Sequence, residues 1–310
     1  MGESMVLLDA LEDGPATLGS SFALRIAGAE SNFAIALARL GVGARWISRL
    51  GRDHFGDLVL ETLEAEGLDV GLVARDADAQ TAAFFKWRSG GRTSVSYLRR
   101  GSAASKLSLE DVPQRALEGI ELVHLTGITM ALSESARTMV VEVARRAHDR
   151  GLIVVFDPNY RPPLWTSAEA AGRACRELFP FVDWLLCGRE EGAAIFGIDE
   201  AEDLVEALTQ DGVGAVVRVG DRGAMLSGPH GPTTVVPRRL EPVADEVGAG
   251  DGFAAGFSYG LLAGWDPVRC ATAGNLIAAC ALRGTGDWET FPFLAEVQEE
   301  LECYKGGVEP

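Results

Sequence analysis

Lysine is scarce in this chain. Only Lys86, Lys106 and Lys305 occur among 310 residues, against 45 aspartates and glutamates, and the formal net charge is −17. A protein that neutralises a phosphate backbone needs clustered cations, and no run of lysine or arginine supplies them. We therefore expect neither nucleic acid nor a membrane surface as a partner. No lysine lies in a G-x-x-x-x-G-K-[ST] loop, which excludes a Walker-type nucleotide site.

Metal-binding and disulfide patterns are also missing. The five cysteines form no C-x-x-C pair, and the four histidines show no H-E-x-x-H spacing. Structural zinc loses support, and free thiols in a reducing, cytoplasmic compartment are expected. The apolar runs are too short to cross a bilayer. His124 lies between apolar residues, so we interpret it as a hydrogen-bonded core histidine rather than a catalytic one.

The remaining composition, 47% hydrophobic and 24% charged, is that of a globular chain that can bury a large core. Short apolar runs alternate with helix-sized segments, which predicts one α/β domain over 1–310: a mostly parallel sheet with helices on both faces. The expected strands are 45–50, 122–125, 153–156, 184–186 and 215–219, and helices are expected over 31–40 and 55–66. Residues 81–87 and 93–98 flank a Gly-Gly turn and predict a hairpin. A sheet-edge hairpin without a role in binding is the alternative.

The segment around Gly248, Ala249 and Gly250 indicates an anion site. These small residues leave backbone N–H groups accessible at the start of a helix, where the helix dipole adds positive potential. Asp251 follows directly, and a carboxylate beside an anion site suits phosphoryl transfer, as a base or as a Mg²⁺ ligand. We expect the helix N-terminus to keep Asp251 ionised and therefore weakly basic.

Two other interpretations of this segment remain open. It could be a plain helix start with an acidic first turn. It could also bind a dinucleotide, since residues 250–255 fit G-x-G-x-x-A. However, the stretch lies late in the chain, and Asn275 stands where a ribose-binding acid would be expected.

A family resemblance rests on two motifs. Asp245, Gly248, Ala249, Gly250 and Asp251 resemble the signature of the PfkB/ribokinase family of sugar kinases, and residues 28–41 resemble its second motif. The resemblance implies a ribokinase-like fold with ATP and Mg²⁺ as cofactors. It also implies a small β lid, formed by approximately 6–26 and 70–105, through which homo-oligomers form. Family chains usually begin with an apolar strand before Gly2-Glu3, so either the start lies upstream of Met1 or the sheet lacks that strand.

The resemblance also assigns roles to residues. Asp251 is the implied catalytic base, and Gly248, Ala249 and Gly250 are the implied donors to the transferred phosphoryl group. Glu191 is implied to hold the metal, directly or through water, although Gly188 replaces the family's asparagine. The implied nucleotide-binding residues are Gly188, Arg218, Gly220, Gly223, Gly248, Gly250, Asn275 and Ala278.

Further stretches resemble the 2-keto-3-deoxygluconate kinase branch, namely Asp157-Pro-Asn-Tyr-Arg161 with Leu164-Trp165, and residues 97–103. The implied substrate-binding residues are Gly28, Ala29, Asn32, Phe84, Tyr97, Arg99, Ile128, Arg161 and Asp287. Arg161 follows a strand end and can hold a carboxylate bidentately, as a sugar acid requires. Pairing of Arg161 with Asp157 is the alternative. Phe84 stands where this branch has tyrosine.

The expected function is therefore ATP-dependent phosphorylation of the terminal hydroxyl of a sugar acid, with 2-keto-3-deoxygluconate as the expected substrate. A fructokinase or ribokinase for a neutral sugar is the first alternative. A non-catalytic sugar-acid or nucleotide sensor on the same fold is the second. The residues do not determine the C4 configuration of the sugar.

Overall fold

The computed structural model describes residues 1–90, 92–228, 231–235 and 247–303. Its largest sheet has six strands in the order β12-β11-β10-β9-β8-β7. They are β7 (Leu122–Thr126), β8 (Ile153–Asp157), β9 (Trp184–Gly188), β10 (Gly214–Arg218), β11 (Ala224–Gly228) and β12 (Gly231–Val235). The first four are parallel, and β11 and β12 are antiparallel. The prediction of a mostly parallel sheet is confirmed.

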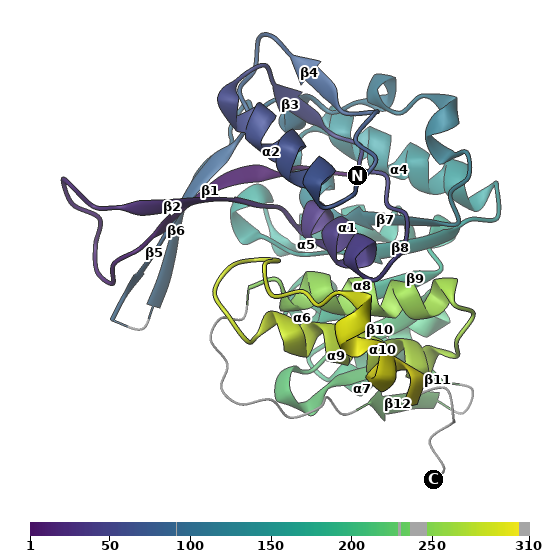
Figure 1. The fold of residues 1–310 in the computed structure, drawn as a ribbon. Helices are drawn as coiled ribbons and strands as arrows, with labels where there is room; N and C mark the ends of the chain where they lie inside the picture. Colours follow the sequence, from purple (N-terminus) through teal and green to yellow (C-terminus); the bar gives the residue numbers. More distant parts are fainter. Residues whose placement is uncertain (91, 229–230, 236–246, 304–310) are drawn as a thin grey trace.

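Helices cover both faces of this sheet (Figure 1). Alternate residues of β8 point to opposite sides, so Val155 packs in one core cluster and Val154 and Phe156 in the other. The cluster with Val155 contains residues of α1 (Ala29–Arg39), α2 (His54–Ala65), α8 (Ala249–Leu262), α9 (Pro267–Ala281) and α10 (Leu294–Cys303). The cluster with Val154 contains residues of α3 (Gly127–Leu132), α4 (Glu134–His148), α5 (Ala168–Arg176), α6 (Arg189–Phe196) and α7 (Ala201–Gln210). The strands are apolar along their whole length because helices bury both of their faces.

The predicted hairpin belongs to a separate sheet that projects from the body, at the left of Figure 1. This sheet, here called the lid, has the order β2-β1-β5-β6. Its strands are β1 (Met5–Ala10), β2 (Phe22–Ala27), β5 (Ala83–Ser89) and β6 (Arg92–Leu98). Leu7 lies opposite Phe84, and Phe84 lies opposite Tyr97, so these three side chains share one face, the inner face. The hairpin is therefore not an isolated edge element.

The β7 edge of the large sheet lacks the strand that was expected over residues 45–50. Among the described residues no strand pairs with the free side of β7, and a groove of about 450 Å³ runs beside it. Only Arg49–Gly51 of the segment 45–50 forms a strand, β3, which pairs with β4 (Ala74–Asp76). Arg45 makes an isolated bridge to Asp69.

His124 is a core residue, as predicted, but stacking rather than hydrogen bonding holds it. Its ring stacks on Phe33 with centroids 3.8 Å apart, and in the described part of the chain neither ring nitrogen has a hydrogen-bond partner. Burial lowers the pKa of His124 well below its usual value, so the imidazole is neutral.

Helices α8 and α9 pack with their backbones in contact. A Cβ atom on Gly256 would lie 2.6 Å from the carbonyl oxygen of Ala273, a separation that real side chains do not tolerate. Glycine therefore permits this approach. Because α8 begins at Ala249, the packing also determines where the Gly-Ala-Gly turn lies.

We expect Gly256→Ala to lower the free energy of unfolding by about 1–3 kcal/mol, because the methyl group forces two packed helices apart. This net loss would occur although alanine favours a helix over glycine by about 1 kcal/mol. Urea denaturation would measure it. Gly43→Ala is the control, since a Cβ atom there meets nothing within 4 Å. Equal midpoints for the two variants would contradict the packing argument.

Candidate active site

A cavity of about 490 Å³ lies between the inner face of the lid and the carboxyl ends of the central strands. Its wall contains every residue predicted to bind the substrate: Gly28, Ala29, Asn32, Phe84, Tyr97, Arg99, Ile128, Arg161 and Asp287. These residues come from the lid, α1, α3, the loop after β8, and the segment 284–291 between α9 and α10. We call this last segment the strap. Their role in sugar binding stays a prediction.

Asp251 lies in the first turn of α8 and lines the same cavity. Its Oδ2 atom accepts a hydrogen bond of 2.8 Å from Nδ2 of Asn32. Gly248 precedes the helix in the left-handed conformation, with φ 81° and ψ −14°. A Cβ atom on Gly248 would lie 1.9 Å from the carbonyl oxygen of Asp287. Both the backbone conformation and the close approach of the strap therefore require glycine here.

The start of α8 is open to an anion. No side chain caps it in the described part of the chain, so its first N–H groups are available for a ligand. Gly248 and Gly250 line the cavity, and Ala249 is the first helical residue between them. The predicted anion site and the predicted base therefore share one cavity.

Burial dominates the electrostatics of Asp251. Desolvation raises the pKa of its carboxyl to about 7, and the nearby carboxylates of Asp157 and Asp287 act in the same direction. The hydrogen bond from Asn32 and the charge of Arg161 oppose the increase in pKa without cancelling it. The expectation that the helix N-terminus makes Asp251 a weak base is therefore wrong. A base with a pKa near neutrality is better matched to proton transfer.

Behind the Gly-Ala-Gly turn, Arg218 joins two acids. Its Nη1 lies 3.0 Å from Oδ2 of Asp157, and its Nη2 lies 3.8 Å from Oε2 of Glu191. The Glu191 carboxylate also accepts hydrogen bonds from the backbone N–H groups of Gly188 and Tyr160. Desolvation and the charge of Asp157 raise the pKa of Glu191 to about 7. Because protein donors engage both of its oxygens, contact with Mg²⁺ through a water molecule suits Glu191 better than direct ligation.

Among the described residues, four cations line the cavity, and three of them have an acidic partner. Lys86 faces Asp287, Arg99 pairs with Glu3, and Arg218 pairs with Asp157. Arg161 is exposed and forms no ion pair with any residue that the structure describes. The alternative in which Asp157 neutralises Arg161 is therefore wrong.

Residues 1–293 match the pfkB family carbohydrate kinases. The chain belongs to this family.

Its relatives span nearly its whole length. It is 34% identical to a 2-dehydro-3-deoxygluconokinase of Bacillus subtilis (strain 168), covering 94% of this chain and 91% of that protein. It is 33% identical to a 2-dehydro-3-deoxygluconokinase of Thermoproteus tenax, covering 98% and 93%. The crystal structure of a PfkB protein from Polaromonas sp. JS666 superposes with a TM-score of 0.87 at 36% identity, over 96% and 97% of the two chains. The protein is thus a carbohydrate kinase with the ribokinase-like fold that its sequence predicts.

The predicted nucleotide-binding residues of this kinase occupy two places. Arg218, Gly248 and Gly250 line the cavity. The others lie outside its lining: Gly188, Gly220, Gly223, Asn275 and Ala278. Gly220 and Gly223 have φ of 66° and 92° in the turn after β10, and Asn275 and Ala278 belong to α9, which packs on β11 and β12. Asp245 lies outside the described residues. The role of this second group stays a prediction.

Sequence reasoning missed several cavity residues of the kinase, chiefly Lys86, Glu3 and Glu30. Lys86 is two residues from Phe84 on the same strand, so the alternation of side chains along β5 points both to the inner face. That signal, with the scarcity of lysine, could have identified it. Glu3 and Glu30 carry no such pattern, because only the tertiary fold places them against the cavity.

Asp251→Asn should lower kcat by about 10²- to 10⁴-fold while preserving the fold, because asparagine cannot accept the substrate's proton. ADP release and circular dichroism would measure the two properties. Asp199→Asn, on an exposed loop, is the matched control. Near-normal turnover of Asp251→Asn would remove Asp251 from the mechanism.

The kcat of the wild-type kinase should rise with pH through about 7, because Asp251 accepts a proton only when deprotonated and its pKa is about 7. The pKa of Glu191 is also about 7, so both carboxyls can contribute to the pH dependence of kcat. The contribution of Asp251 is the part of this pH dependence that is lost in Asp251→Asn. A pH-independent wild-type kcat between 6 and 8 would contradict the assignment.

The same increase in pKa predicts an effect on stability. The folded state holds the Asp251 proton more tightly than the unfolded state, so stability falls as pH rises from about 4 to about 7. Asp251→Asn should therefore raise the melting temperature at pH 8 more than at pH 5. Thermal unfolding at both pH values measures this difference. Equal changes in melting temperature at pH 5 and pH 8 would contradict an increased pKa of Asp251 in the folded state.

Proposed function

We propose that this kinase transfers the γ-phosphate of ATP to the terminal hydroxyl of 2-keto-3-deoxygluconate. The observation that carries the proposal is that Arg161 lies on the cavity wall and forms no ion pair with the residues that the structure describes. A guanidinium without a protein counter-ion can bind a carboxylate bidentately, and a sugar acid supplies one where fructose and ribose do not. The names of the two 2-dehydro-3-deoxygluconokinase relatives support the same substrate.

In the proposed reaction the sugar's terminal hydroxyl lies beside Asp251, which Asn32 orients through its hydrogen bond. The hydroxyl oxygen forms a bond to the γ-phosphorus as the bond from that phosphorus to ADP breaks, and the hydroxyl proton passes to the Asp251 carboxylate. N–H groups of Gly248, Ala249 and Gly250 stabilise the charge on the transferred phosphoryl group. A sensor would not need a carboxylate whose pKa is near 7, which argues against the non-catalytic alternative.

The nucleotide side of the proposal involves Arg218 and Glu191. A Cβ atom on Gly250 would lie 3.6 Å from Nη2 of Arg218, so this guanidinium is beside the Gly-Ala-Gly turn and can contact an ATP phosphate. Mg²⁺ bound to ATP needs only one or two carboxylates besides phosphates and water, and Glu191 can serve through a water molecule. When bound, the metal neutralises phosphate charge. Gly188, Gly220, Gly223, Asn275 and Ala278 would surround the rest of the nucleotide.

Arg161→Ala should lower kcat/KM for the keto acid by roughly tenfold to more than a hundredfold, the equivalent of about 1.5–3 kcal/mol for a hydrogen bond to a charged group. Arg161→Lys should recover part of the loss, because an ammonium cannot form the forked contact. A coupled ADP-release assay would use 2-keto-3-deoxygluconate, its galactonate epimer, fructose, ribose and gluconate. Arg173→Ala, on an exposed helix face, is the control.

The panel also tests the neutral-sugar alternative. Activity on fructose or ribose comparable to that on the keto acid in the wild type would overturn the sugar-acid assignment. Equal losses on acid and neutral sugars in Arg161→Ala, with a lowered melting temperature, would make Arg161 structural.

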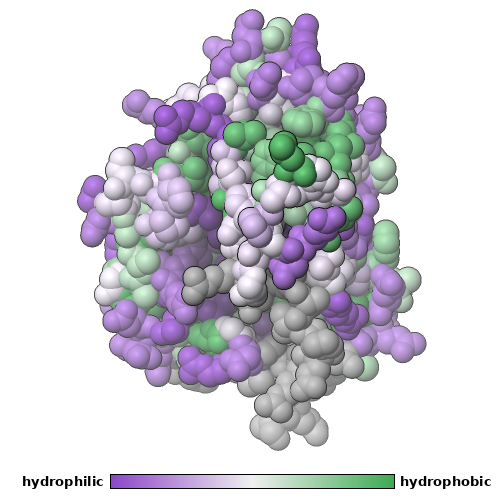
Figure 2. Space-filling view, turned by 90° about the vertical axis from the view of Figure 1, so that its left-hand side faces the viewer, coloured by the Kyte–Doolittle hydropathy of each residue, from purple (hydrophilic) through white to green (hydrophobic). Residues whose placement is uncertain are grey.

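We also propose that two copies of the kinase pair through the outer face of the lid. The register places Leu8 opposite Leu24 and Phe85, and Leu98 opposite Ala83, on the side away from the cavity. Leu24 is 55% exposed and Leu98 is 62% exposed. Figure 2, viewed from the lid side, shows hydrophobic side chains open on this face of the molecule. An exposed apolar sheet face of this kind favours association.

Leu24→Glu should convert the oligomer to a monomer, because a charge at the centre of an apolar interface is costly to bury. Light scattering would measure the mass of both proteins, and circular dichroism would check the fold. A monomeric wild type, or an unchanged mass in Leu24→Glu, would contradict pairing through this face.

A further inference from the structure

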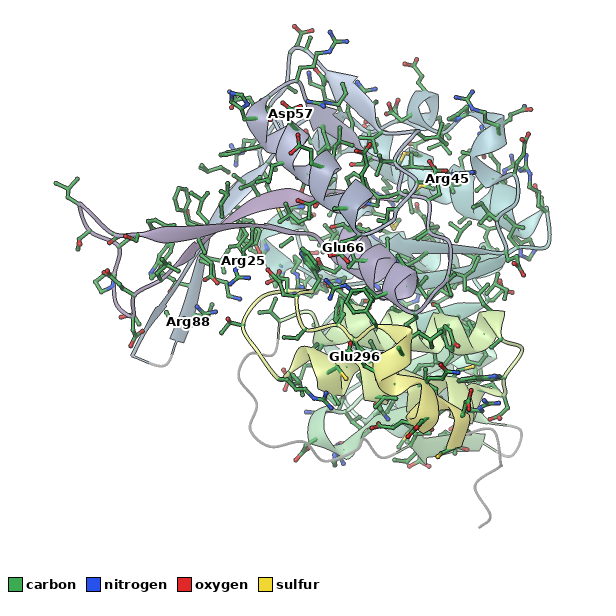
Figure 3. All side chains as sticks on the ribbon, viewed as in Figure 1. Arg25, Arg45, Asp57, Glu66, Arg88 and Glu296 are labelled. Atoms are coloured by element: carbon green, nitrogen blue, oxygen red, sulfur yellow. The ribbon has the colours of Figure 1, made fainter. Side chains whose placement is uncertain are left out.

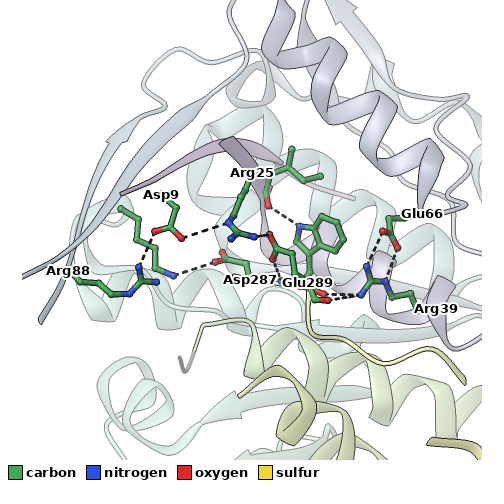
Figure 4. A network of polar contacts seen from close by, with 10 residues as sticks. Asp9, Arg25, Arg39, Glu66, Arg88, Asp287 and Glu289 are labelled. Atoms are coloured by element: carbon green, nitrogen blue, oxygen red, sulfur yellow. Dashed lines mark hydrogen bonds and ion pairs between the residues drawn. The ribbon is translucent and has the colours of Figure 1, made fainter. Parts of the chain in front are cut away.

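Two ion pairs join the lid to the strap. Arg25 of β2 places Nη1 2.6 Å from Oε1 of Glu289, and Lys86 of β5 places Nζ 3.7 Å from Oδ1 of Asp287 (Figure 4). Figure 3 shows Arg25 near the base of the lid, close to the strap. The two pairs differ in position, because Lys86 and Asp287 line the cavity and the other two residues do not.

The backbone of the strap is held by other contacts. Arg39 of α1 donates hydrogen bonds of 2.8–3.3 Å to the carbonyl oxygens of Trp288, Glu289 and Phe291. The indole Nε1 of Trp288 donates to the carbonyl oxygen of Ile26 at 2.9 Å (Figure 4). With the Arg25–Glu289 pair, these contacts fix the path of the strap without Lys86.

Lys86 differs from these residues in being a buried lysine that lines the cavity. Its side chain is 2% exposed, and a buried ammonium loses hydration that its ion pair repays only in part. Lysine is also rare in this acidic chain. The ammonium of Lys86 faces the carboxylate of Asp287, whose own backbone packs against Gly248 of the Gly-Ala-Gly turn.

We propose that Lys86 is a positioning residue for sugar binding. Its ammonium holds the Asp287 carboxylate in the orientation in which Asp287 accepts hydrogen bonds from the sugar's hydroxyl groups. Because Lys86 belongs to the lid and Asp287 to the strap, the carboxylate is oriented only when the lid lies over the cavity. The proposal rests on the proposed function in so far as Asp287 faces the sugar, but not on which sugar is phosphorylated.

The test is a double-mutant cycle with Lys86→Met and Asp287→Asn, using steady-state kinetics in which sugar and ATP are varied separately. Lys86→Met should raise KM for the sugar by about tenfold, the loss of one charge-assisted contact, and leave KM for ATP within about twofold. The double variant should be no worse than the poorer single variant, because both changes remove one shared contact. Lys86→Arg should restore part of the sugar affinity.

Lys106→Met is the matched control, because this lysine is half-exposed, pairs with Asp76 and lies outside the cavity. An unchanged sugar KM in Lys86→Met, or additive losses in the double variant, would overturn the proposal. If Lys86→Met does not fold, Lys86→Arg decides: a raised sugar KM with normal ATP kinetics supports positioning, and normal sugar kinetics or equal defects for both substrates overturn it.

The assay uses whichever sugar of the panel the wild type converts fastest. If that sugar is neutral, the sugar-acid function fails while the role of Lys86 is still decided.

Discussion

The hydrogen bond between Asn32 and Asp251 joins the two parts of the active site. Asn32 lies in the first helix, which follows the lid strands β1 and β2, and Asp251 lies in the first turn of the helix that follows Gly248. The contact orients the Asp251 carboxylate. It depends in turn on the glycines of α8 and α9, because only their close packing brings the turn to this position. The small residues of two packed helices thus determine where the Asp251 carboxylate lies.

Most of the positive charge in the cavity is paired with acidic side chains of the protein. The chain has a formal net charge of −17, and the described lining of the cavity contains four cations beside five acidic side chains. Three of them are neutralised by acids from other elements, which keeps them in place at little net gain in stability. The fourth, Arg161, has no such partner among the described residues. Arg161 is therefore the cation of the described lining that remains to bind an anionic group of a ligand, as the proposed function requires.

Much of the fold could be predicted because the governing interactions are local or periodic. Strands such as Ile153–Asp157 are apolar on both faces, and the hairpin has a Gly-Gly turn between β-favouring segments. The Gly-Ala-Gly turn could be predicted because small residues before a helix leave its first N–H groups accessible. His124 was assigned correctly to the core but with the wrong partner, since neither its neighbours nor its spacing indicates that Phe33 stacks on it.

The sequence by itself therefore determined the α/β class, the two motifs and many of the residues that line the cavity. It did so because side-chain periodicity, backbone freedom and residue type are properties of short segments. Only the tertiary structure decided that Asp251 has a pKa near 7, that Asp157 neutralises Arg218 instead of Arg161, and that Lys86 faces Asp287. Desolvation and ion pairing depend on which distant groups are brought within a few ångströms, and no single segment contains that information.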